Sequence, residues 1–426
     1  MHHAKLFRRD FTLMVAGQVI SLLGNAVLSF ALPLYVLDGT GNAAAFGGVL
    51  ALSTAVTVLL SPVGGLLADR FPRQRIMYLL DFFTAAVLAL TALVLARGGG
   101  TGPAAGLLLA LSAIEACYQP SVTASVPLLV KADQLAAANG VVAQVQALSN
   151  LLGPILGGFL YAAFGLRPLL WVGAGCFAAS AVLELFLRIP FVRRTVRGGA
   201  LAQARADLGE ALRFLLRDRP ALFRLLLVTA GLNLSLSALY TVGLPVLVKN
   251  CLGLGDGLYG LAQGALGVGA VLGGLAAAGA ASRLPLRRSH LPLLAAAALL
   301  LPVALALVLP LPPLAAYGVL LAALLLGMAG ATVFSVLAQT CFQRLTPPAL
   351  LGKVASFVTA IAVCAMPLGQ GFYGVLFEVL ARHAWAVVLL GGAASLLLAL
   401  ACGRVLPGLE GRPDGAPESE SSPGPC

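Results

Sequence analysis

The feature that most constrains this chain is a series of long apolar segments separated by short breaks of glycine, proline or charged residues. Twelve of these segments are long enough to cross a bilayer core of about 30 Å as α-helices. Hydrophobic residues make up 60% of the 426 residues and charged residues only 10%, which is too little charge to cover a water-exposed surface. Because lipid offers no hydrogen-bond partners, a spanning backbone must satisfy its own, as a helix does. The sequence therefore predicts an all-α integral membrane protein.

The predicted spans form two groups of six, joined by one long connection. We expect an N-terminal six-helix half at 1–188, a cytoplasmic linker at 189–221, a C-terminal half at 222–405 and a tail at 406–426. The tail is rich in Pro, Gly, Ser and Glu, which predicts disorder. In the linker, apolar residues at 207–217 recur at helical spacing and predict an amphipathic helix on the membrane surface. The spans are predicted at 11–36, 45–68, 76–96, 104–125, 139–163, 168–188, 222–248, 258–280, 290–310, 313–338, 354–378 and 384–404.

Basic residues orient these spans. If the chain begins inside the cell, all but four of its 27 lysines and arginines fall in inside segments, the exceptions being Arg97, Arg167, Lys249 and Arg382. Cytoplasmic loops carry such an excess of positive charge. We therefore expect a multi-pass protein of a bacterial-type cytoplasmic (plasma) membrane, with both termini in the cytoplasm. The first apolar run is too long for a signal-peptide core and is expected to be the first span. The net charge of +11 reflects this topology and does not indicate a nucleic-acid partner.

Two short sequences recur at corresponding places in the two halves. Residues 32–36, LPLYV, recur as LPVLV at 244–248. The run GPILGGFLY, which starts at Gly153, corresponds to MPLGQGFYG, which starts at Met366. The similarity is weak, as an ancient duplication would leave it. Two parallel six-helix repeats usually place a substrate site at their interface, near the middle of the membrane.

The run GGLLADRFPRQR at 64–75 lies between the second and third spans. It resembles the signature between helices 2 and 3 of the major facilitator superfamily, with departures at Pro72 and Gln74. A second motif resembles the helix-5 signature of that superfamily's exporters, and residues 119–139 are similar to the macrolide-efflux and siderophore-exporter branch of drug:proton antiporters. The matching residues are Gly65, Leu67, Ala68, Asp69, Arg70 and Arg73 in the first signature and Gly153, Pro154, Gly157 and Gly158 in the second.

This resemblance implies the twelve-helix fold of the superfamily, with spans 1, 4, 7 and 10 around a central path. It also implies multidrug or macrolide efflux by antiport with protons, and a bend at Gly153 and Pro154 is associated with export in this family. We expect a monomer in the lipid bilayer that acts on a small-molecule substrate. No cofactor or metal ion is expected, because the seven cysteines and four histidines show no metal-ligand spacing.

One acidic residue falls near the middle of a predicted span. Glu115 lies about ten residues from either end of span 4, where an ionisable side chain is costly and usually functional. Burial favours the protonated carboxyl group, which suits a residue that takes up a proton on one side and releases it on the other. A counter-charge for a cationic drug and a neutral structural glutamate are the alternatives. Relatives often carry an acid near Asn25, and because an amide cannot carry a proton, coupling would depend on Glu115.

Polar residues line one face of four predicted spans, at steps of three or four residues. Because the resemblance places these spans around the central path, we expect the stripes to line a substrate cavity. Hydrogen bonding between helices is the alternative for each residue. The stripes are Gln18, Ser21, Asn25 and Ser29 in span 1, Ser112, Glu115 and Gln119 in span 4, Asn233, Ser237 and Tyr240 in span 7, and Thr332, Ser335 and Gln339 in span 10.

The hairpin at 64–75 is expected to close the cytoplasmic mouth against the start of span 11, near 353–357. Asp69 would suit the partial positive charge at the N-terminus of that helix. Arg73 needs an acidic partner, for which Asp81 is the nearest in sequence, and Glu184 is expected to pair with Arg188 one turn away. The alternative is a loop whose arginines only anchor the topology.

The sequence therefore favours a proton-driven exporter of amphipathic small molecules, such as macrolide-like drugs or siderophores. The alternative within transport is a lipid or lysolipid flippase on the same fold, whose sideways-open cavity leaves no signal in the sequence. A membrane enzyme is disfavoured because the chain contains neither H-E-x-x-H nor G-x-S-x-G. An ATP-driven pump is disfavoured because the chain contains no G-x-x-x-x-G-K-[ST] loop.

Overall fold

The computed structural model describes residues 7–190, 200–280, 288–348 and 350–407. Within these ranges, twelve helical segments are long and apolar enough to cross a membrane, which confirms the predicted fold class. Most of the tail that was predicted to be disordered lies outside the described residues, as do residues 191–199 of the linker. The first six spans are α1 (Arg9–Thr40), α2 (Ala43–Arg70), α3 (Arg73–Ala96), α4 (Gly102–Leu129), α5 (Leu135–Phe164) and α6 (Leu166–Leu185). The last five are α9 (Asp256–Ala280), α10 with α11 (Leu291–Ala298 and Leu300–Val308), α12 (Pro313–Leu345), α13 (Leu351–Val379) and α14 (Ala384–Val405).

The seventh span changes its helix type partway across. It begins as the α-helix α8 (Pro220–Leu232) and continues as the π-helical segments η3 (Asn233–Ser237), η4 (Leu239–Gly243) and η5 (Val246–Cys251). π-Helical turns are rare and often lie at functional sites. The apolar pattern of the sequence predicted this span but not its widened second half.

The turn between α1 and α2 is fixed by two residue types. Gly41 ends α1 with φ 64°, and its N–H donates to the carbonyl oxygen of Leu37 at 2.7 Å. This left-handed conformation favours glycine at the end of a helix. The next residue, Asn42, caps α2, because its side-chain oxygen accepts a hydrogen bond from the N–H of Ala45 at 2.8 Å.

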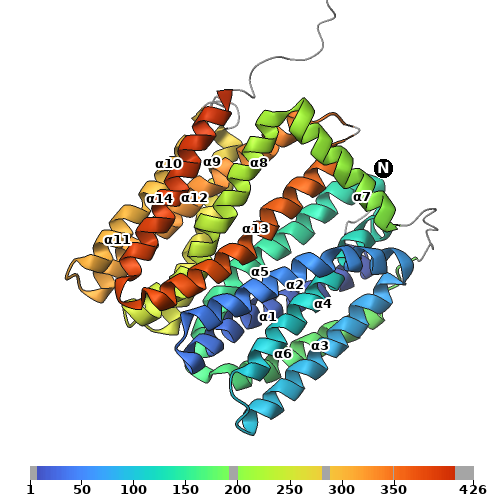
Figure 1. Ribbon diagram of the computed structural model, residues 1–426. Helices are drawn as coiled ribbons and strands as arrows, with labels where there is room; N and C mark the ends of the chain where they lie inside the picture. Colours follow the sequence, from blue (N-terminus) through green and yellow to red (C-terminus); the bar gives the residue numbers. More distant parts are fainter. Residues whose placement is uncertain (1–6, 191–199, 281–287, 349, 408–426) are drawn as a thin grey trace, which may run out of the picture.

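The first six spans and the last six meet along two helix pairs. Figure 1 shows α13 beside α2, and α5 packs against α9. At both crossings the backbones approach without side chains between them. A Cβ atom added to Gly47 would lie 2.7 Å from Cα of Gly374, and one added to Gly158 would lie 2.9 Å from Cα of Gly260. Both contacts lie away from the hairpin at 64–75, so we name the two ends of the bundle the hairpin end and the opposite end.

The linker helix α7 (Ala200–Arg213) crosses the hairpin end of the bundle and leads into α8 (Figure 1). Lys353, near the start of α13, forms ion pairs with Asp207 at 2.9 Å and with Glu210 at 2.6 Å, so α7 is fastened to the last six spans. The sequence predicted an amphipathic helix lying on the membrane surface, but part of its apolar face packs into the protein core. The buried residues are Ala211, Phe214 and Leu215.

Two adjacent glycines of the hairpin signature differ in how closely they pack. A Cβ atom at Gly64 would lie 2.1 Å from the carbonyl oxygen of Ala116 in α4, whereas one at Gly65 would meet nothing within 4 Å. We predict that Gly64→Ala forces α2 away from α4 and lowers stability by about 1–3 kcal/mol, the usual cost of overpacking. Gly65→Ala is the matched control and should keep or slightly raise the melting temperature of the purified protein, because alanine favours the helix and meets nothing there. Equal melting temperatures for the two variants would contradict this packing.

Candidate functional site

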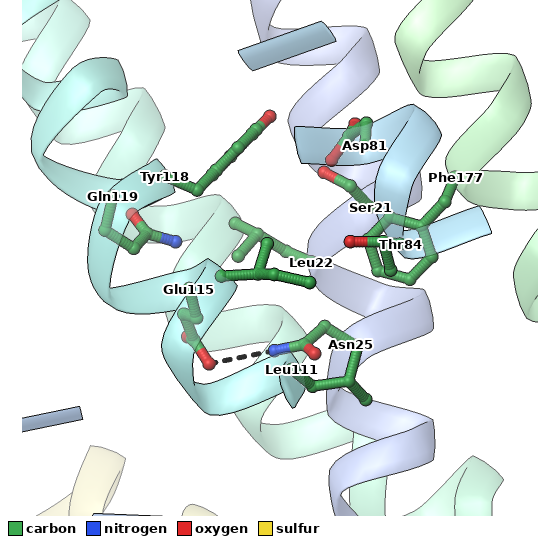
Figure 2. Close-up of a pocket in the computed structure, with 11 residues that line it drawn as sticks. Ser21, Leu22, Asn25, Asp81, Thr84, Leu111, Glu115, Tyr118, Gln119 and Phe177 are labelled. Atoms are coloured by element: carbon green, nitrogen blue, oxygen red, sulfur yellow. Dashed lines mark hydrogen bonds between the residues drawn. The ribbon is translucent and has the colours of Figure 1, made fainter. Parts of the chain in front are cut away.

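A small pocket lies among α1, α3, α4 and α6 (Figure 2). Its volume is about 30 Å³, the share of roughly one water molecule in the liquid. On one side of the pocket, the side-chain nitrogen of Asn25 donates a hydrogen bond to the carboxyl group of Glu115 at 3.0 Å. Gln119 lies one turn further along α4 and also lines the pocket. Three residues predicted for proton coupling or substrate binding therefore meet here, and Ser21 and Asp81, which were also singled out from the sequence, line the same pocket.

The sequence singles out Asn25 in span 1 and Glu115 in span 4 but predicts no contact between them, and the structure joins the two. In the described part of the chain, no lysine, arginine or histidine forms an ion pair with Glu115. The apolar side chains of Leu22 and Leu111 complete this side of the pocket (Figure 2). An amide can donate to a carboxylate through its nitrogen or accept from a carboxylic acid through its oxygen. Asn25 can therefore stabilise Glu115 in both protonation states.

Arg73 is held within the hairpin. Its guanidinium group donates to the carbonyl oxygens of Ala68 at 3.0 Å and of Ala124 at 2.8 Å. It also lies 3.9 Å from the carboxylate of Asp69, whereas Asp81, the acid nearest in the sequence after the hairpin, lies in the pocket of Figure 2. Arg73 thus joins α2 to α3 and α4 at the hairpin end.

Two other expected contacts are replaced by different ones. Glu184 accepts a hydrogen bond from the hydroxyl of Tyr118 at 2.6 Å inside the protein, whereas the sequence suggested a partner in Arg188. At the start of α13, which was expected to meet Asp69, Lys353 binds α7. Between described residues, no hydrogen bond or ion pair joins the hairpin to the start of α13. In this conformation the hairpin end is therefore not closed by the expected contact.

A larger cavity, of about 240 Å³, lies between the two groups of spans. It is bordered by α1, α2 and α5 on one side and by η4, α9 and α13 on the other. At its border, the ring of Phe30 from α1 stacks on the ring of Tyr259 from α9, with centroids 4.6 Å apart. No charged residue is among the described residues that line it, and the polar groups are amides and hydroxyls. These polar residues are Ser29, Asn150, Thr241, Gln263 and Gln370.

The remaining predicted site residues lie elsewhere. Gln18 is fully buried, and neither atom of its amide has a hydrogen-bond partner among the described residues. Asn233 donates to the carbonyl oxygen of Thr229 in its own helix at 3.2 Å. Tyr240 lines an apolar pocket inside the last six spans. Gln339 lines a separate cavity of about 340 Å³ among α8, α12 and α13.

Some signal for the missed cavity residues was present in the sequence. Gln370 is part of the repeat MPLGQGFYG, and Asn150 precedes Gly153 by three residues, which puts both on one helix face. The glycines themselves serve close packing. A Cβ atom on Gly153 would lie 2.3 Å from Cβ of Ala26 in α1, and one on Gly157 would lie 3.0 Å from the ring of Phe30. The helix-5 signature thus brings α5 against α1 at the edge of the cavity.

An ion-pair network joins the two groups of spans at the opposite end. Lys249 of η5 pairs with Asp38 of α1 and with Asp256 at the start of α9. The hydroxyl of Tyr161 in α5 donates a hydrogen bond to the second carboxylate oxygen of Asp38 at 2.9 Å. One lysine therefore links two carboxylates that belong to different groups of spans.

Two further hydrogen bonds join the two groups of spans, one at the opposite end and one nearer the cavity. The N–H of Ala43, the first residue of α2, donates to the carboxylate of Glu378 in α13 at 2.8 Å. Deeper in the bundle, the hydroxyl of Thr54 donates to the side-chain oxygen of Gln370 at 3.0 Å. Between residues that the structure describes, the hydrogen bonds and ion pairs that join the first six spans to the last six lie at the opposite end or beside the cavity. The cavity is therefore covered from the opposite end.

The fold and the cavity define a class, a membrane protein with twelve spans in the described residues and a cavity between two groups of six. Residues 14–362 match the family model of the Major Facilitator Superfamily, and the chain belongs to this family, as the hairpin signature predicted. It is 23% identical to Macrolide efflux protein A of Streptococcus pyogenes over 424 residues, which cover 93% of this chain and 96% of that protein. It is 26% identical to Multidrug efflux pump Tap of Mycobacterium tuberculosis over 386 residues, which cover 87% and 88% of the two chains.

A shorter match and two solved structures complete the comparison. The chain is 32% identical over 224 residues to the uncharacterized MFS-type transporter YfiS of Bacillus subtilis, and this match spans about half of that relative, 51%. The nucleoside transporter NupG superposes with a TM-score of 0.68 at 15% identity, over 92% of this chain and 98% of that chain. A bacterial homologue of the iron transporter ferroportin, in its inward-facing state, superposes with a TM-score of 0.67 at 21% identity and the same coverage. At these identities the structures support the fold alone.

We predict that Lys249→Gln opens the opposite end, because it leaves Asp38 and Asp256 as neighbouring carboxylates without the cation between them. The reporter is Thr241→Cys, which lines the cavity, in a protein whose other cysteines have been replaced. A thiol reagent that does not cross the membrane, added on the side of the opposite end, should label this cysteine several-fold faster in the Lys249→Gln protein. Lys131→Gln, at an exposed lysine, is the control and should not change the rate. Equal labelling rates with and without Lys249 would contradict the conclusion that this lysine holds the opposite end closed.

Proposed function

We propose that this protein is a proton-coupled exporter of amphipathic small molecules that works by alternating access. The observation that carries the proposal is a cavity between the two groups of spans, covered at the opposite end by the network around Lys249. Alternating access requires a site between two structural repeats that opens to one side at a time. The excess of lysine and arginine at the hairpin end supports a cytoplasmic location for that end. The covered end would then face outward, as in a transporter ready to take up a substrate from the cytoplasm.

The chemistry of the cavity supports an uncharged amphipathic substrate. Its amides and hydroxyls can donate and accept hydrogen bonds, and its aromatic rings offer apolar area for a bulky ligand. A cationic drug would find no carboxylate among the described lining residues. The similarity to a macrolide efflux protein and to a multidrug efflux pump supports export of drug-like molecules by this chain as well.

Proton coupling is assigned to Glu115. The residue lies in a water-sized pocket and has the amide of Asn25 as its polar partner. A proton on Glu115 would remove a buried charge, and release of that proton would restore one, so the two states differ strongly in their preference for burial. A conformational change that alters access to the pocket would therefore change the affinity of Glu115 for its proton.

We predict that Glu115→Gln abolishes pH-gradient-driven efflux and leaves folding intact, because the amide matches the protonated acid in size but cannot release a proton. The assay is efflux from vesicles that contain the purified protein, across a panel of dyes, macrolides and siderophores. Asp133→Asn, at an exposed carboxylate, is the matched control and should transport like the parent protein. Undiminished efflux in the Glu115→Gln protein would remove Glu115 from the mechanism. Transfer of labelled lysolipid without any response to the drug panel would favour a flippase.

The hairpin is proposed to form the cytoplasmic gate. Asp69 is about half exposed, with 48% of its side chain accessible. Its neighbour Arg70 is exposed, and a Cβ atom added to Gly65 would meet nothing within 4 Å. In the present conformation the ion-pair partner of Asp69 among the described residues is Arg73, across the turn. When the cytoplasmic side closes, the start of α13 would approach the hairpin, and its free N–H groups would suit the Asp69 carboxylate. Asp81 has no part in this contact, because it lines the small pocket of Figure 2.

We predict that Asp69→Asn slows transport without weakening substrate binding, because the neutral amide loses most of its attraction to the helix N-terminus in the closed state only. The maximal rate of efflux should fall several-fold while the dissociation constant of the substrate, measured on the detergent-solubilised protein, stays the same. Asp218→Asn, at an exposed acid on the same side of the protein, serves as the control. Unchanged turnover in the Asp69→Asn protein would return the hairpin to the role of a topology anchor.

A further inference from the structure

Two carboxyl groups lie buried beside each other in the first six spans, at positions that the proposed transport cycle does not use. Asp81 of α3 is 2% exposed and Glu184 of α6 is 0% exposed. The hydroxyl of Tyr118 donates to one oxygen of Glu184 at 2.6 Å, and the carboxyl group of Asp81 faces the hydroxyl of Ser180. One oxygen of each carboxyl group has no hydrogen-bond partner among the described residues.

No positive charge accompanies this pair. Within the described ranges, no lysine, arginine or histidine forms an ion pair with Asp81 or Glu184. The titratable groups that face the pair are Tyr118 from α4 and, across the pocket of Figure 2, Glu115. Two buried carboxylates without a cation would be very costly, and neighbouring carboxyl groups avoid this by keeping a proton. The pair therefore requires at least one bound positive charge.

The hydrogen-bond pattern around the pair indicates that this charge is a proton. The hydroxyls of Ser21 and Ser180 both donate to the carbonyl oxygen of Gly17, each at 3.1 Å. A serine hydroxyl has a single hydrogen, so Ser180 can donate to a carboxylate at Asp81 only by giving up its bond to Gly17. It can accept a hydrogen bond from a protonated Asp81 and keep that bond, so the pattern favours a proton on the pair. The neighbouring Gln18, also fully buried, adds an amide whose two atoms lack partners among the described residues.

The pair communicates with Glu115 through the small pocket. Asp81, Tyr118 and Glu115 all line it, and Figure 2 shows Asp81 and Tyr118 toward one end and the Asn25–Glu115 contact toward the other. The pocket has room for about one water molecule, and its polar lining can hold one. A water in this position would connect the two sites by hydrogen bonds.

We propose that Asp81 and Glu184 form a proton-binding site that holds one proton between them and exchanges it with Glu115 through the pocket. In the exchange, one carboxyl O–H bond breaks and another forms, and no other bond changes. The role in coupling rests on the proposed function, but the binding of the proton does not. The pair would be a second station for the transported proton, between Glu115 and the hairpin end.

The first test measures thermal stability against pH in detergent, in a Glu115→Gln background that removes the other pocket acid. A folded protein that holds a proton which the unfolded chain has released loses stability as pH rises. The melting temperature should therefore fall as the pH rises above about 5, where the carboxyl groups of the unfolded chain have released their protons. Adding Asp81→Asn and Glu184→Gln together should flatten this fall, whereas adding Asp133→Asn should leave it in place. A fall that the two amides leave unchanged would overturn the proposal.

A second readout works on folded protein and needs neither substrate nor gradient. In the same background, infrared spectra at neutral pH should contain the carbonyl band of a protonated carboxylic acid, which the two amides remove and which Tyr118→Phe shifts by deleting the hydrogen bond to Glu184. If the double variant does not fold, the Tyr118→Phe shift decides. Absence of the band, or loss of it on addition of sodium or calcium ions, would overturn the proposal, in the second case in favour of a metal cation. If the band is present but no pH gradient drives efflux, the site stands and the proposed function fails.

Discussion

Inside a bilayer, a polar side chain without a partner is costly, and this constraint explains where the polar residues of this protein lie. The lipid supplies no hydrogen bonds, so each amide, hydroxyl or carboxyl group must find a partner in the protein or border a cavity that holds water or ligand. Glu115 has Asn25, Glu184 has Tyr118, and Lys249 holds two carboxylates at the opposite end. Polar atoms that have no partner among the described residues, such as the amide of Gln18 and one oxygen of Asp81, are therefore the most informative positions in the spans.

The same constraint separates what the sequence could predict from what it could not. The twelve spans follow from apolar length alone, and the hairpin follows from a short charged run between two of them, so both signals are local. The signal for the orientation of each helix about its own axis is not local in the sequence. Lipid and protein interior are both apolar, so a spanning helix shows little contrast between its faces, and polar stripes in spans 1, 4, 7 and 10 did not reveal which residues face the other half. Asn150 and Gln263 line the central cavity from spans 5 and 8, outside the four spans with predicted polar stripes.

Asp81 and Glu184 illustrate a second limit. Both lie toward the ends of their predicted spans. At such positions an acid is most simply explained by exposure to solvent or by an ion pair with an arginine nearby in the sequence. Their burial results from the packing of α3 against α6 and α4, which joins residues more than a hundred positions apart. Tyr118 and Ser180, which surround the pair, also come from separate helices. Only the tertiary structure could bring these four residues together.

The glycine crossings between the two groups of spans have a mechanical consequence. Gly47 lies close to one end of α2, and from there to Arg70 the helix extends for about 35 Å at 1.5 Å per residue. A rotation of about 10° around the contact of Gly47 with Gly374 would therefore move the far end of this lever by about 6 Å. Because no side chains interlock at the crossing, such a rotation requires little repacking. A small rotation at the contact of Gly47 with Gly374 is thus amplified along the helix into an opening wide enough for a small molecule.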